Sequence, residues 1–347
     1  MSKKSKQVAL GMSGGVDSSL CAHLLKEQGY EVTGVFLECW RAPGCRTDQD
    51  HQDALKIALE LGIPFKVLDF KKTYHDKVVE YFFKEYQAGR TPNPDIMCNK
   101  EIKFGLFYDW AMENNFDFVA TGHYAKTKNG QLLTPKDEWK DQTYFLYLIS
   151  DDQLQHILFP LADLTKKEVR AEAKKRNIHV ADKPDSVGIC FIGDIDVKKF
   201  IKKRLGEKSG EVIDTQGNVI GTHNGIWFYT IGQRHGFTIT QKNSDTPPLY
   251  VIDKDAKKNQ LIVSIGADAY QSEFLVSELH LIDQSKKLPT KLFIRIRHTG
   301  KLLPAKVEKN LVKLQKPAKG IAAGQSAVFY QKIDNNNFRC IGGGIIN

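Results

Sequence analysis

The sequence predicts an α/β protein in which a parallel-sheet domain is followed by a small β-rich central domain and a C-terminal β-barrel. In the N-terminal half, short apolar runs alternate with segments of helical periodicity, which is typical of parallel strands joined by helices. Towards the C-terminus, short β-type runs separated by turn signals replace this alternation. A chain of 347 residues is long enough for two or three domains. We place them at residues 1–205, 206–272 and 273–347.

The first domain is predicted element by element from apolar periodicity and from its glycine and proline breaks. Strands are expected at Gln7–Leu10, Tyr30–Leu37, Phe65–Phe70 and Asp117–Ala120. Helices are expected at Ser18–Gln28, Gln52–Leu61 and Thr165–Arg176. Because strands that alternate with helices form a parallel sheet, the ligand site belongs at the carboxyl ends of these strands.

Composition excludes several classes of protein. No apolar run approaches the roughly 18 residues of a membrane span, and the lysine-rich start leads directly into a strand, so we expect a cytoplasmic protein. The six cysteines are widely scattered, which argues against a structural disulfide framework. The net charge of +9 favours a polyanionic partner, although many basic proteins are merely soluble.

The stretch Gly11–Ser19 has the composition of a phosphate-binding loop. Ser13, Gly14 and Gly15 permit a tight turn, and the helix that follows directs its N–H groups and positive dipole end towards an anion. The loop does not fit the Walker motif, because Asp17 stands where a lysine would be needed, and it does not match the glycine spacing of the dinucleotide fingerprint either. It resembles the PP-loop of the N-type ATP pyrophosphatases, which cleave ATP between its α and β phosphates. That resemblance implies that Asp17 helps to hold magnesium on the pyrophosphate.

A second informative stretch runs from residue 89 to residue 104 and contains Cys98. Pro92 and Pro94 stiffen the backbone, so Cys98 is expected on a rigid loop ahead of a helix that starts near Asn99. A thiol near a helix N-terminus is ionised more easily, and Arg90, Lys100 and Lys103 add positive charge. Cys98 is therefore a candidate reactive thiol, with a buried loop cysteine as the alternative.

Other polar positions follow the same logic. Gly122 and His123 come directly after a strand, where a nucleotide or substrate would lie, although a lone histidine is more often structural. Residues 140–142 precede what we read as an aromatic strand. Cys190 lies in an apolar segment between glycines and close to two basic helices. Cys39 and Cys45 lack a second cysteine or histidine pair, so we do not expect a zinc site there.

Six motifs together identify a family. They are the loop 13–18, the stretch 89–104, and the segments 120–125, 140–147, 188–193 and 230–234. Together they resemble the MnmA family of tRNA-specific 2-thiouridylases, within the PP-loop ATP pyrophosphatase superfamily, and the resemblance spans nearly the whole chain. It departs at Leu37, where methionine is typical, in the shorter loop between Cys39 and Cys45, and at the variable position Val187.

The resemblance implies a role for each matching residue. It implies that Cys98 is the nucleophile, that Cys190 carries a persulfide, and that the two form a disulfide in one catalytic state. ATP would be bound by Gly11, Met12, Ser13, Gly14, Gly15, Val16, Asp17, Ser18, Leu37 and Gly122. The target base would meet Asn93, Pro94 and Asp95, and Asp95 is also our candidate acid or base. Contacts to tRNA are assigned to His123, Lys140, Asp141, Gln142, Arg295, Arg297 and Gln325.

The C-terminal half is predicted to be all-β. A hairpin is expected over 210–221, further strands over 227–231, 249–253 and 260–264, and a small barrel from about residue 273. The strand Phe293–His298 alternates apolar and basic residues, so Arg295 and Arg297 would share one face suited to phosphates. An ordinary solvated strand face is the alternative.

The sequence thus predicts an ATP-dependent sulfurtransferase that acts on tRNA. ATP with magnesium would adenylate the 2-carbonyl oxygen of the wobble uridine, and sulfur from Cys190 would replace that oxygen, with Cys98 resolving the intermediate. A cysteine desulfurase or a sulfur-relay carrier would supply the persulfide. Two alternatives remain. A PP-loop enzyme that acts on a small molecule would not need two reactive cysteines, and a non-catalytic RNA-binding module would leave the phosphate loop unexplained.

Overall fold

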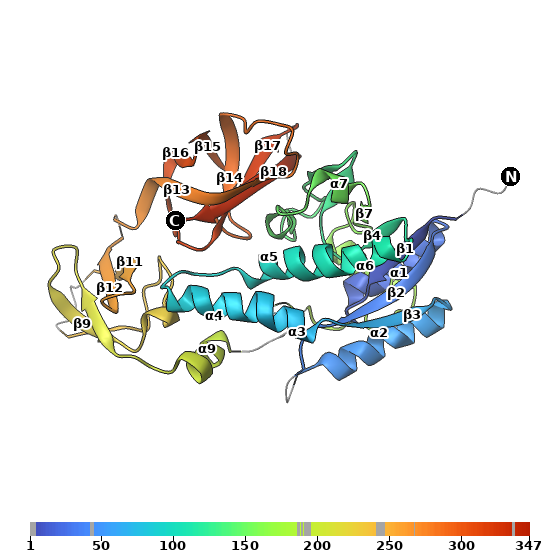
Figure 1. Ribbon diagram of the computed structural model, residues 1–347, viewed down its shortest axis with the longest axis horizontal. Helices are drawn as coiled ribbons and strands as arrows, with labels where there is room; N and C mark the ends of the chain where they lie inside the picture. The colour runs from blue at the N-terminus through green and yellow to red at the C-terminus, as the bar shows by residue number, and fades with distance from the viewer. Residues whose placement is uncertain are drawn as a thin grey trace.

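The computed structural model describes residues 5–41, 45–185, 188, 190, 196–240, 247–266, 268–334 and 337–347. The molecule is elongated, with the parallel-sheet domain at one end, the small central domain at the other, and the barrel seated over the helices between them (Figure 1). In the described part of the chain, no helix is both long and apolar enough to cross a membrane. The predicted fold class, a parallel sheet followed by two β-rich units, is confirmed.

The first domain is built on a five-stranded parallel sheet with the order β3-β2-β1-β4-β7. Its strands are β1 (Gln7–Gly11), β2 (Glu31–Glu38), β3 (Phe65–Asp69), β4 (Phe118–Ala120) and β7 (Ile157–Leu158). In this order, β2 and β3 lie on one side of β1, and β4 and β7 lie on the other. The loop after β1 therefore lies at the switch point where such sheets bind ligands.

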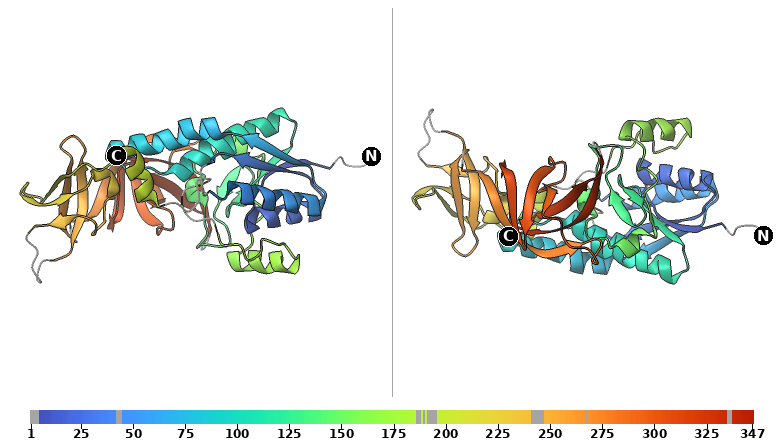
Figure 2. Two further views of the ribbon diagram at one scale, coloured as in Figure 1. Left: turned by 90° about the horizontal axis from the view of Figure 1, so that it is seen from below. Right: turned by 90° about the horizontal axis from the view of Figure 1, so that it is seen from above.

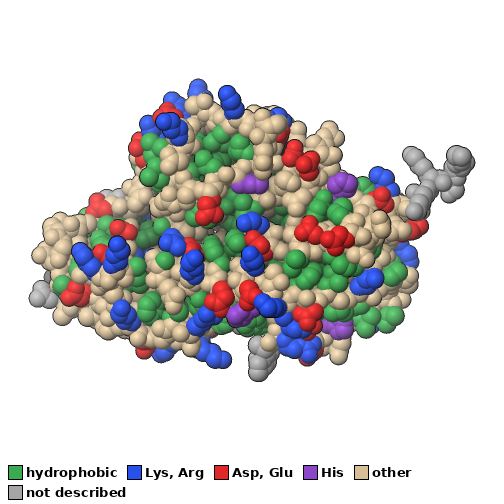
Figure 3. Space-filling view, viewed as in Figure 1, with side chains coloured by type: hydrophobic (Ala, Val, Ile, Leu, Met, Phe, Trp, Pro, Cys, Tyr) green, Lys and Arg blue, Asp and Glu red, His purple; other side chains and the backbone are tan. Residues whose placement is uncertain are grey.

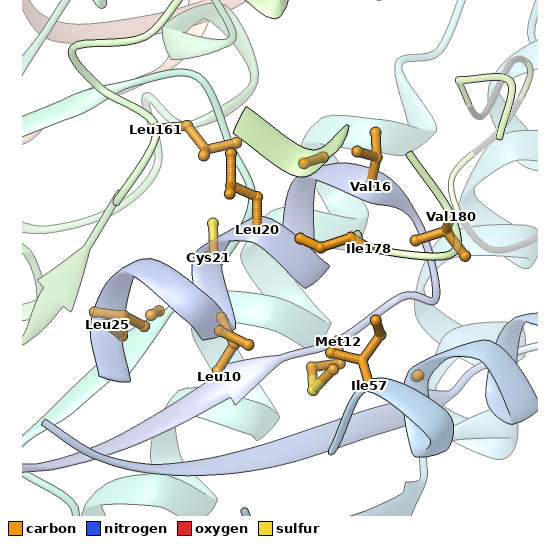
Figure 4. Packing of buried hydrophobic residues seen from close by; sticks show 14 of the residues in the cluster. Leu10, Met12, Val16, Leu20, Cys21, Leu25, Ile57, Leu161, Ile178 and Val180 are labelled. Atoms are coloured by element: carbon orange, nitrogen blue, oxygen red, sulfur yellow. The ribbon is translucent and has the colours of Figure 1, made fainter. Parts of the chain in front are cut away.

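Alternate residues of β1 face two different cores. Val8 and Leu10 pack under α1 (Val16–Glu27), α2 (Thr47–Leu61) and α8 (Lys166–Lys175), as Figure 4 shows around Leu20 and Cys21. Cys21 is fully buried there, as expected of a packed core thiol. Ala9 faces the opposite core, which contains residues of the long helices and of α9 (Val197–Leu205).

Two long helical segments cover that second face. The first comprises α3 (Lys71–Tyr74), η1 (His75–Val79) and α4 (Glu80–Gln87), and the second α5 (Pro94–Cys98), η2 (Asn99–Leu106) and α6 (Phe107–Glu113). The expectation that Cys98 precedes a helix starting near Asn99 is wrong. The helix starts at Pro94, because the Asn93 side chain caps it by accepting from Ile96 N (3.3 Å) and proline suits the first helical position.

The central domain contains a five-stranded sheet with the order β10-β9-β8-β12-β11. Its strands are β8 (Gly210–Ile213), β9 (Val219–His223), β10 (Thr238–Ile239), β11 (Leu249–Asp255) and β12 (Gln260–Ile265). The predicted hairpin is present as the antiparallel pair β8–β9. The strand predicted over 227–231 is wrong, since its first residues belong to the 3-10 helix η4 (Ile226–Phe228), whose Ile226 packs into the small core of this domain.

The C-terminal strands close into an antiparallel barrel, because β13 pairs with both β16 and β18. The strands are β13 (Tyr270–Leu281), β14 (Lys291–Arg295), β15 (Leu303–Glu308), β16 (Leu311–Lys319), β17 (Ser326–Lys332) and β18 (Phe338–Ile346). A hairpin of the first domain, β5 (Lys126–Lys128) and β6 (Gln131–Leu133), extends this sheet, since β6 pairs with β18. Both views in Figure 2 place the barrel against the first domain. The domain boundaries 205/206 and 272/273 stay predictions.

The segment that follows the hairpin, between β6 and β7, is irregular. It contains the 3-10 helix η3 (Thr143–Phe145) where we expected an aromatic strand, followed by α7 (Asp151–Leu154). Tyr144 and Tyr147 are buried, and both bond Ser326 of β17 through their hydroxyl groups. These aromatic residues anchor the barrel instead of forming a sheet.

Candidate active site

The loop after β1 folds as a compact turn into α1. Gly14 has φ of +70°, and a Cβ there would lie 2.1 Å from the Asp50 carbonyl oxygen, so only glycine fits. The Ser18 hydroxyl accepts from Ser13 N (3.1 Å) and lies 3.3 Å from the Ser13 hydroxyl. Ser13 itself is exposed. The loop therefore presents a hydroxyl and the first N–H groups of a helix at the carboxyl edge of the sheet.

The remaining predicted ATP residues lie around this loop. Met12 continues β1 by donating its N–H to Val35 O (2.8 Å), and Leu37 is buried near the end of β2. Gly122 follows β4, and a Cβ there would lie 3.0 Å from Ser18 N. Gly122 thus permits the close approach of the loop after β4 to the start of α1.

Asp17 is held by two neighbours. Lys166 Nζ lies 2.7 and 2.8 Å from its carboxylate oxygens, and the Tyr124 hydroxyl donates to Oδ1 at 2.8 Å. Its side chain keeps 31% of its exposure, so an incoming ligand can reach the carboxylate. Asp17 is therefore a fixed, accessible anion beside the phosphate loop.

Lys183, whose side chain is largely buried, holds the phosphate loop in place. Lys183 Nζ contacts Gly14 O (2.8 Å), Asp50 Oδ1 (2.7 Å) and Asp53 Oδ2 (2.5 Å). Burial alone would raise the pKa of Asp53, but hydrogen bonds from Lys183 and Gln49 lower it. Lys183 thus fixes the turn at Gly14 to α2.

Asp185 joins the phosphate loop to the segment that leads to Cys190. Its carboxylate accepts from Lys140 (2.6 Å), from Arg170 (2.6 Å) and from Lys166 (2.9 Å). Although burial would raise the pKa of Asp185, the hydrogen bonds from Lys140 and Lys166 hold that pKa at about 2. Because Lys166 also binds Asp17, one cation bridges the nucleotide loop and the sulfur segment.

The two predicted catalytic thiols meet in space although they are far apart in sequence. The Cys98 thiol donates to Cys190 Sγ, and the two sulfur atoms are 3.5 Å apart. Both are free thiols, with Cys98 fully buried and Cys190 partly exposed. A disulfide needs sulfur atoms about 2.05 Å apart, so only a small movement separates this arrangement from the geometry of a disulfide, which would form with loss of two electrons and two protons. Val187 and Gly193, also noted in the sequence, lie outside the described residues.

Two side chains hold the backbone of Cys190. Asp95 Oδ1 accepts from Cys190 N (2.9 Å), and the Tyr74 hydroxyl donates to Cys190 O (2.5 Å). Burial raises the pKa of Asp95 above its ordinary value, despite the hydrogen bond from Cys190 N and the nearby Lys103. Asp95 is thus a positioning residue in this state.

Lys103 provides the positive charge at the thiols. The hydrogen bond from Cys98, together with the charge and hydrogen bond of Lys103, lowers the pKa of Cys190 to about 7, although burial and the charge of Asp95 oppose this shift. Removal from water would lower the pKa of Lys103, but Cys190 and Cys98 raise it above its ordinary value. The ammonium group of Lys103 therefore favours a thiolate at Cys190.

His123 fixes that ammonium group. Burial and the charge of Lys103 hold the pKa of His123 well below its ordinary value, so its ring is neutral. Nδ1 lies 2.8 Å from Thr121 Oγ1 and Nε2 lies 3.5 Å from Lys103 Nζ. Since an ammonium group can only donate, Nε2 accepts from Lys103 and Nδ1 carries the proton.

The expectation that a helix N-terminus favours a thiolate at Cys98 is wrong. Burial and the neighbouring Cys190 sulfur raise the pKa of Cys98 well above the ordinary value, and Lys103 only partly opposes them. Cys98 is therefore the protonated partner, and Cys190 is the one whose thiolate is favoured. Cys39 is also buried in the hydrophobic cluster that contains both thiols.

The barrel supports the loop before α5. Gln325 Nε2 donates to the carbonyl oxygens of Thr91 (3.0 Å) and Pro92 (3.1 Å). Gly324 packs so closely that a Cβ there would lie 3.0 Å from Thr91 N. The predicted base-contacting residues 93–95 thus start from a backbone that a second domain holds in place.

The predicted tRNA contacts divide into accessible and buried groups. Arg297 is exposed, whereas Arg295 and Asp141 form a 2.5 Å ion pair with side-chain exposures of 11% and 2%. The expectation that Arg295 and Arg297 share an exposed strand face is wrong, because β14 ends at Arg295 and the Arg295 guanidinium turns inward to Asp141, which lies between β6 and η3. Asp141 likewise has no free carboxylate for RNA, since its other oxygen bonds Thr143.

The comparisons assign the chain to a family. Three family models match consecutive segments, namely the tRNA methyl transferase HUP domain at 6–194, the tRNA methyl transferase PRC-barrel domain at 198–265, and the aminomethyltransferase beta-barrel domain at 271–346. The tRNA-specific 2-thiouridylase MnmA of Lactobacillus gasseri is 43% identical, over 98% of this chain and 95% of the relative. The protein of that name from Streptococcus sanguinis is 42% identical, over 100% and 97%.

The chain belongs to the tRNA-specific 2-thiouridylase family.

Among solved structures, the match is limited to part of the fold. The U34-tRNA thiolase NcsA from Methanococcus maripaludis is 20% identical, with a TM-score of 0.38 over 58% of this chain and 64% of that one. A 4-thiouridine synthetase in complex with RNA and ATP is 16% identical, with a TM-score of 0.38 over 57% and 50%. Likeness at this level carries no inference about activity.

Sequence reasoning missed several residues of this 2-thiouridylase site. In the sequence, Lys166 is one of several basic residues of the helix 165–176, Lys103 is one of several charges near Cys98, and neither Lys183 nor Asp185 belongs to a motif with an assigned role. The run Lys-Pro-Asp at 183–185 was a usable signal, since a lysine and an aspartate held on either side of a proline lead directly into the Cys190 segment.

Proposed function

We propose that this 2-thiouridylase adenylates the 2-carbonyl oxygen of the wobble uridine of tRNA and replaces it with sulfur from a cysteine persulfide. The products are 2-thiouridine, AMP and pyrophosphate. The observation that carries this proposal is the 3.5 Å approach of Cys98 and Cys190 at the ligand edge of a sheet that also bears the phosphate loop. A small-molecule PP-loop enzyme has no need for such a pair.

ATP is proposed to lie on the loop 11–18, with its phosphates against the N–H groups at the start of α1 and its adenine near Leu37 and Gly122. Magnesium is commonly held by one or two carboxylates together with phosphate oxygens and water. Asp17, an accessible carboxylate beside the loop, fits this pattern. Magnesium held there would neutralise charge on the pyrophosphate that leaves.

The sulfur chemistry follows from the different states of the two thiols. Cys190, favoured as a thiolate, accepts a sulfur atom from a persulfide donor and becomes a persulfide. The terminal sulfur bonds to C2 of the adenylated uridine, and the C2–O bond breaks as AMP leaves. Cys98 then gives up its proton and attacks the Cys190 sulfur. The resulting disulfide releases the bonding electron pair to the sulfur on C2, and a thiol reductant restores both cysteines.

Asp95 is proposed as the proton acceptor for Cys98, which lies one helical turn after it. Its raised pKa makes the carboxylate a better base than an ordinary aspartate. Residues 93–95 would face the target base, while Lys140, Gln142, Arg297 and Gln325 remain proposed contacts to tRNA. His123, buried against Lys103, would approach RNA only at the base itself.

The test is tRNA-dependent release of pyrophosphate together with mass analysis of the wobble nucleoside. Wild-type protein with ATP, tRNA and a persulfide donor should give both pyrophosphate and 2-thiouridine. Cys340→Ser is the control for the loss of a thiol, since Cys340 is as deeply buried as Cys98 but lies on β18 of the barrel. Pyrophosphate release that does not depend on tRNA would favour a small-molecule substrate, and no release would refute the ATP chemistry.

A further inference from the structure

Trp139 is the most exposed large hydrophobic side chain in the described part of the chain, with 88% of its surface accessible. Tryptophan is usually well buried because its large apolar surface is costly to hydrate. An indole that is presented almost entirely to water, beside residues already proposed to meet tRNA, calls for a binding explanation.

The backbone that carries Trp139 is firmly held. The buried Asp137 accepts from Trp139 N (3.1 Å) and Lys140 N (3.2 Å) through Oδ1, and from Lys166 N (2.7 Å) through Oδ2. The same carboxylate thus fixes the turn and the start of α8. The exposure of the indole is therefore built into an ordered turn.

That turn lies at the rim of the active site. Lys140, the next residue, binds Asp185, and Asp185 is joined through Lys166 to Asp17 of the phosphate loop. Two residues further, Gln142 accepts from the backbone N–H of Tyr124 (2.9 Å), whose hydroxyl bonds Asp17. Trp139 therefore belongs to the network that holds the nucleotide loop and the segment leading to Cys190.

The chemistry of the indole selects the kind of ligand. Proteins that read single-stranded or loop RNA place exposed aromatic rings so that unstacked bases lie flat on them. On the face shown in Figure 3, basic and acidic side chains are intermixed, so charge alone does not mark a nucleic-acid surface there. A flat aromatic surface next to a lysine fits a nucleobase with its phosphate better than it fits a purely ionic partner.

We propose that Trp139 binds tRNA by stacking on an unpaired base of the anticodon loop that flanks the target uridine. This inference rests on the proposed function, since it assumes that an anticodon loop enters the site. Trp139 then supplies affinity and register for the loop, and it takes no part in the chemistry at the sulfur atoms.

The test measures binding of a fluorescently labelled anticodon stem-loop RNA by anisotropy, at several salt concentrations. Trp139→Ala should raise Kd by about 5- to 150-fold, the loss expected for one stacked base, whereas Trp139→Phe should stay within about fivefold of wild type. Because no phosphate contact is lost, the salt dependence of Kd should keep its slope. Leu59→Ala, which removes another exposed side chain (71% accessible) on α2, is the matched control and should bind as wild type.

Intrinsic fluorescence gives a second readout. Stem-loop RNA should quench the emission of wild type, and Trp139→Phe should lose most of that quenching while retaining its binding. If Trp139→Ala binds within twofold of wild type, or if it impairs only transfer from the persulfide donor, the stacking proposal is overturned. Failure of wild type to bind any stem-loop would instead overturn the proposed function together with this inference.

Discussion

Replacing Lys103 by methionine tests the electrostatic basis of the site most directly. The substitution keeps an unbranched side chain on η2 but removes the charge that favours a thiolate at Cys190. With a pKa of about 7, half of the Cys190 thiols are ionised at pH 7. A pKa that rises by one to two units, to about 8 or 9, leaves roughly 9% to 1% ionised.

The alkylation rate of Cys190 at pH 7 should therefore fall by about 5- to 50-fold. The direction of the pKa shift of Cys190 determines the pH range in which the alkylation rates of the two proteins differ. A lowered pKa adds thiolate only at pH values below the ordinary thiol range, so the two proteins should converge near pH 10. The measurement is iodoacetamide labelling from pH 5 to 10, with the Cys190 peptide quantified by mass spectrometry.

Two variants control for side effects of the substitution. Lys103→Arg keeps a cation and should retain most of the reactivity, and Lys100→Met removes an exposed lysine from the same helical segment and should change nothing. If the profile of Lys103→Met coincides with that of wild type, Lys103 does not set the ionisation of Cys190, and the hydrogen bond from Cys98 must account for all of it.

Three further predictions concern separate parts of the molecule. Asp17→Ala should abolish pyrophosphate release while leaving the Kd for tRNA within about twofold; continued AMP transfer would remove the aspartate from the ATP site. Arg295→Ala should lower the free energy of unfolding by about 3–5 kcal/mol, because it leaves the buried carboxylate of Asp141 without its ion-pair partner. Arg297→Ala should change the free energy of unfolding by less than about 0.5 kcal/mol. Equal effects of the two substitutions in urea titrations would contradict the inward position of Arg295. Cys98→Ser should still adenylate tRNA and accept a persulfide at Cys190, whereas Cys190→Ser should adenylate tRNA but accept no useful sulfur, as pyrophosphate assays and mass analysis of the labelled peptides would show.

Local features of the fold were predictable from the sequence. The phosphate loop is marked by its own small residues, and the strands and helices around it by apolar periodicity over a few positions. The start of α5 was also predictable in principle, because Asn93 followed by Pro94 is a cap followed by a favoured first residue. The two prolines instead suggest a rigid loop, and the start predicted near Asn99 lies five residues after the observed start at Pro94.

Contacts between distant segments could not be predicted in this way. Nothing near Arg295 in the sequence indicates that its partner is Asp141, which lies between β6 and η3 of the first domain. The meeting of Cys98 with Cys190 was expected only from the family resemblance, and the lowered pKa of Cys190 depends on that meeting. The alternation in residues 293–298 suggested a shared exposed face, but the end of β14 and the buried aspartate decided otherwise.

The pairing of β6 with β18 also bears on how the protein is made. Chains begin to fold from the N-terminus as they are synthesised. The strand that pairs with β6, however, is β18, the last strand of the chain. Gln325, which holds the carbonyl groups of Thr91 and Pro92, is made just before it. A product that stops short of the barrel therefore lacks the contacts that hold the loop before α5, and one edge of its β6 has lost its partner strand.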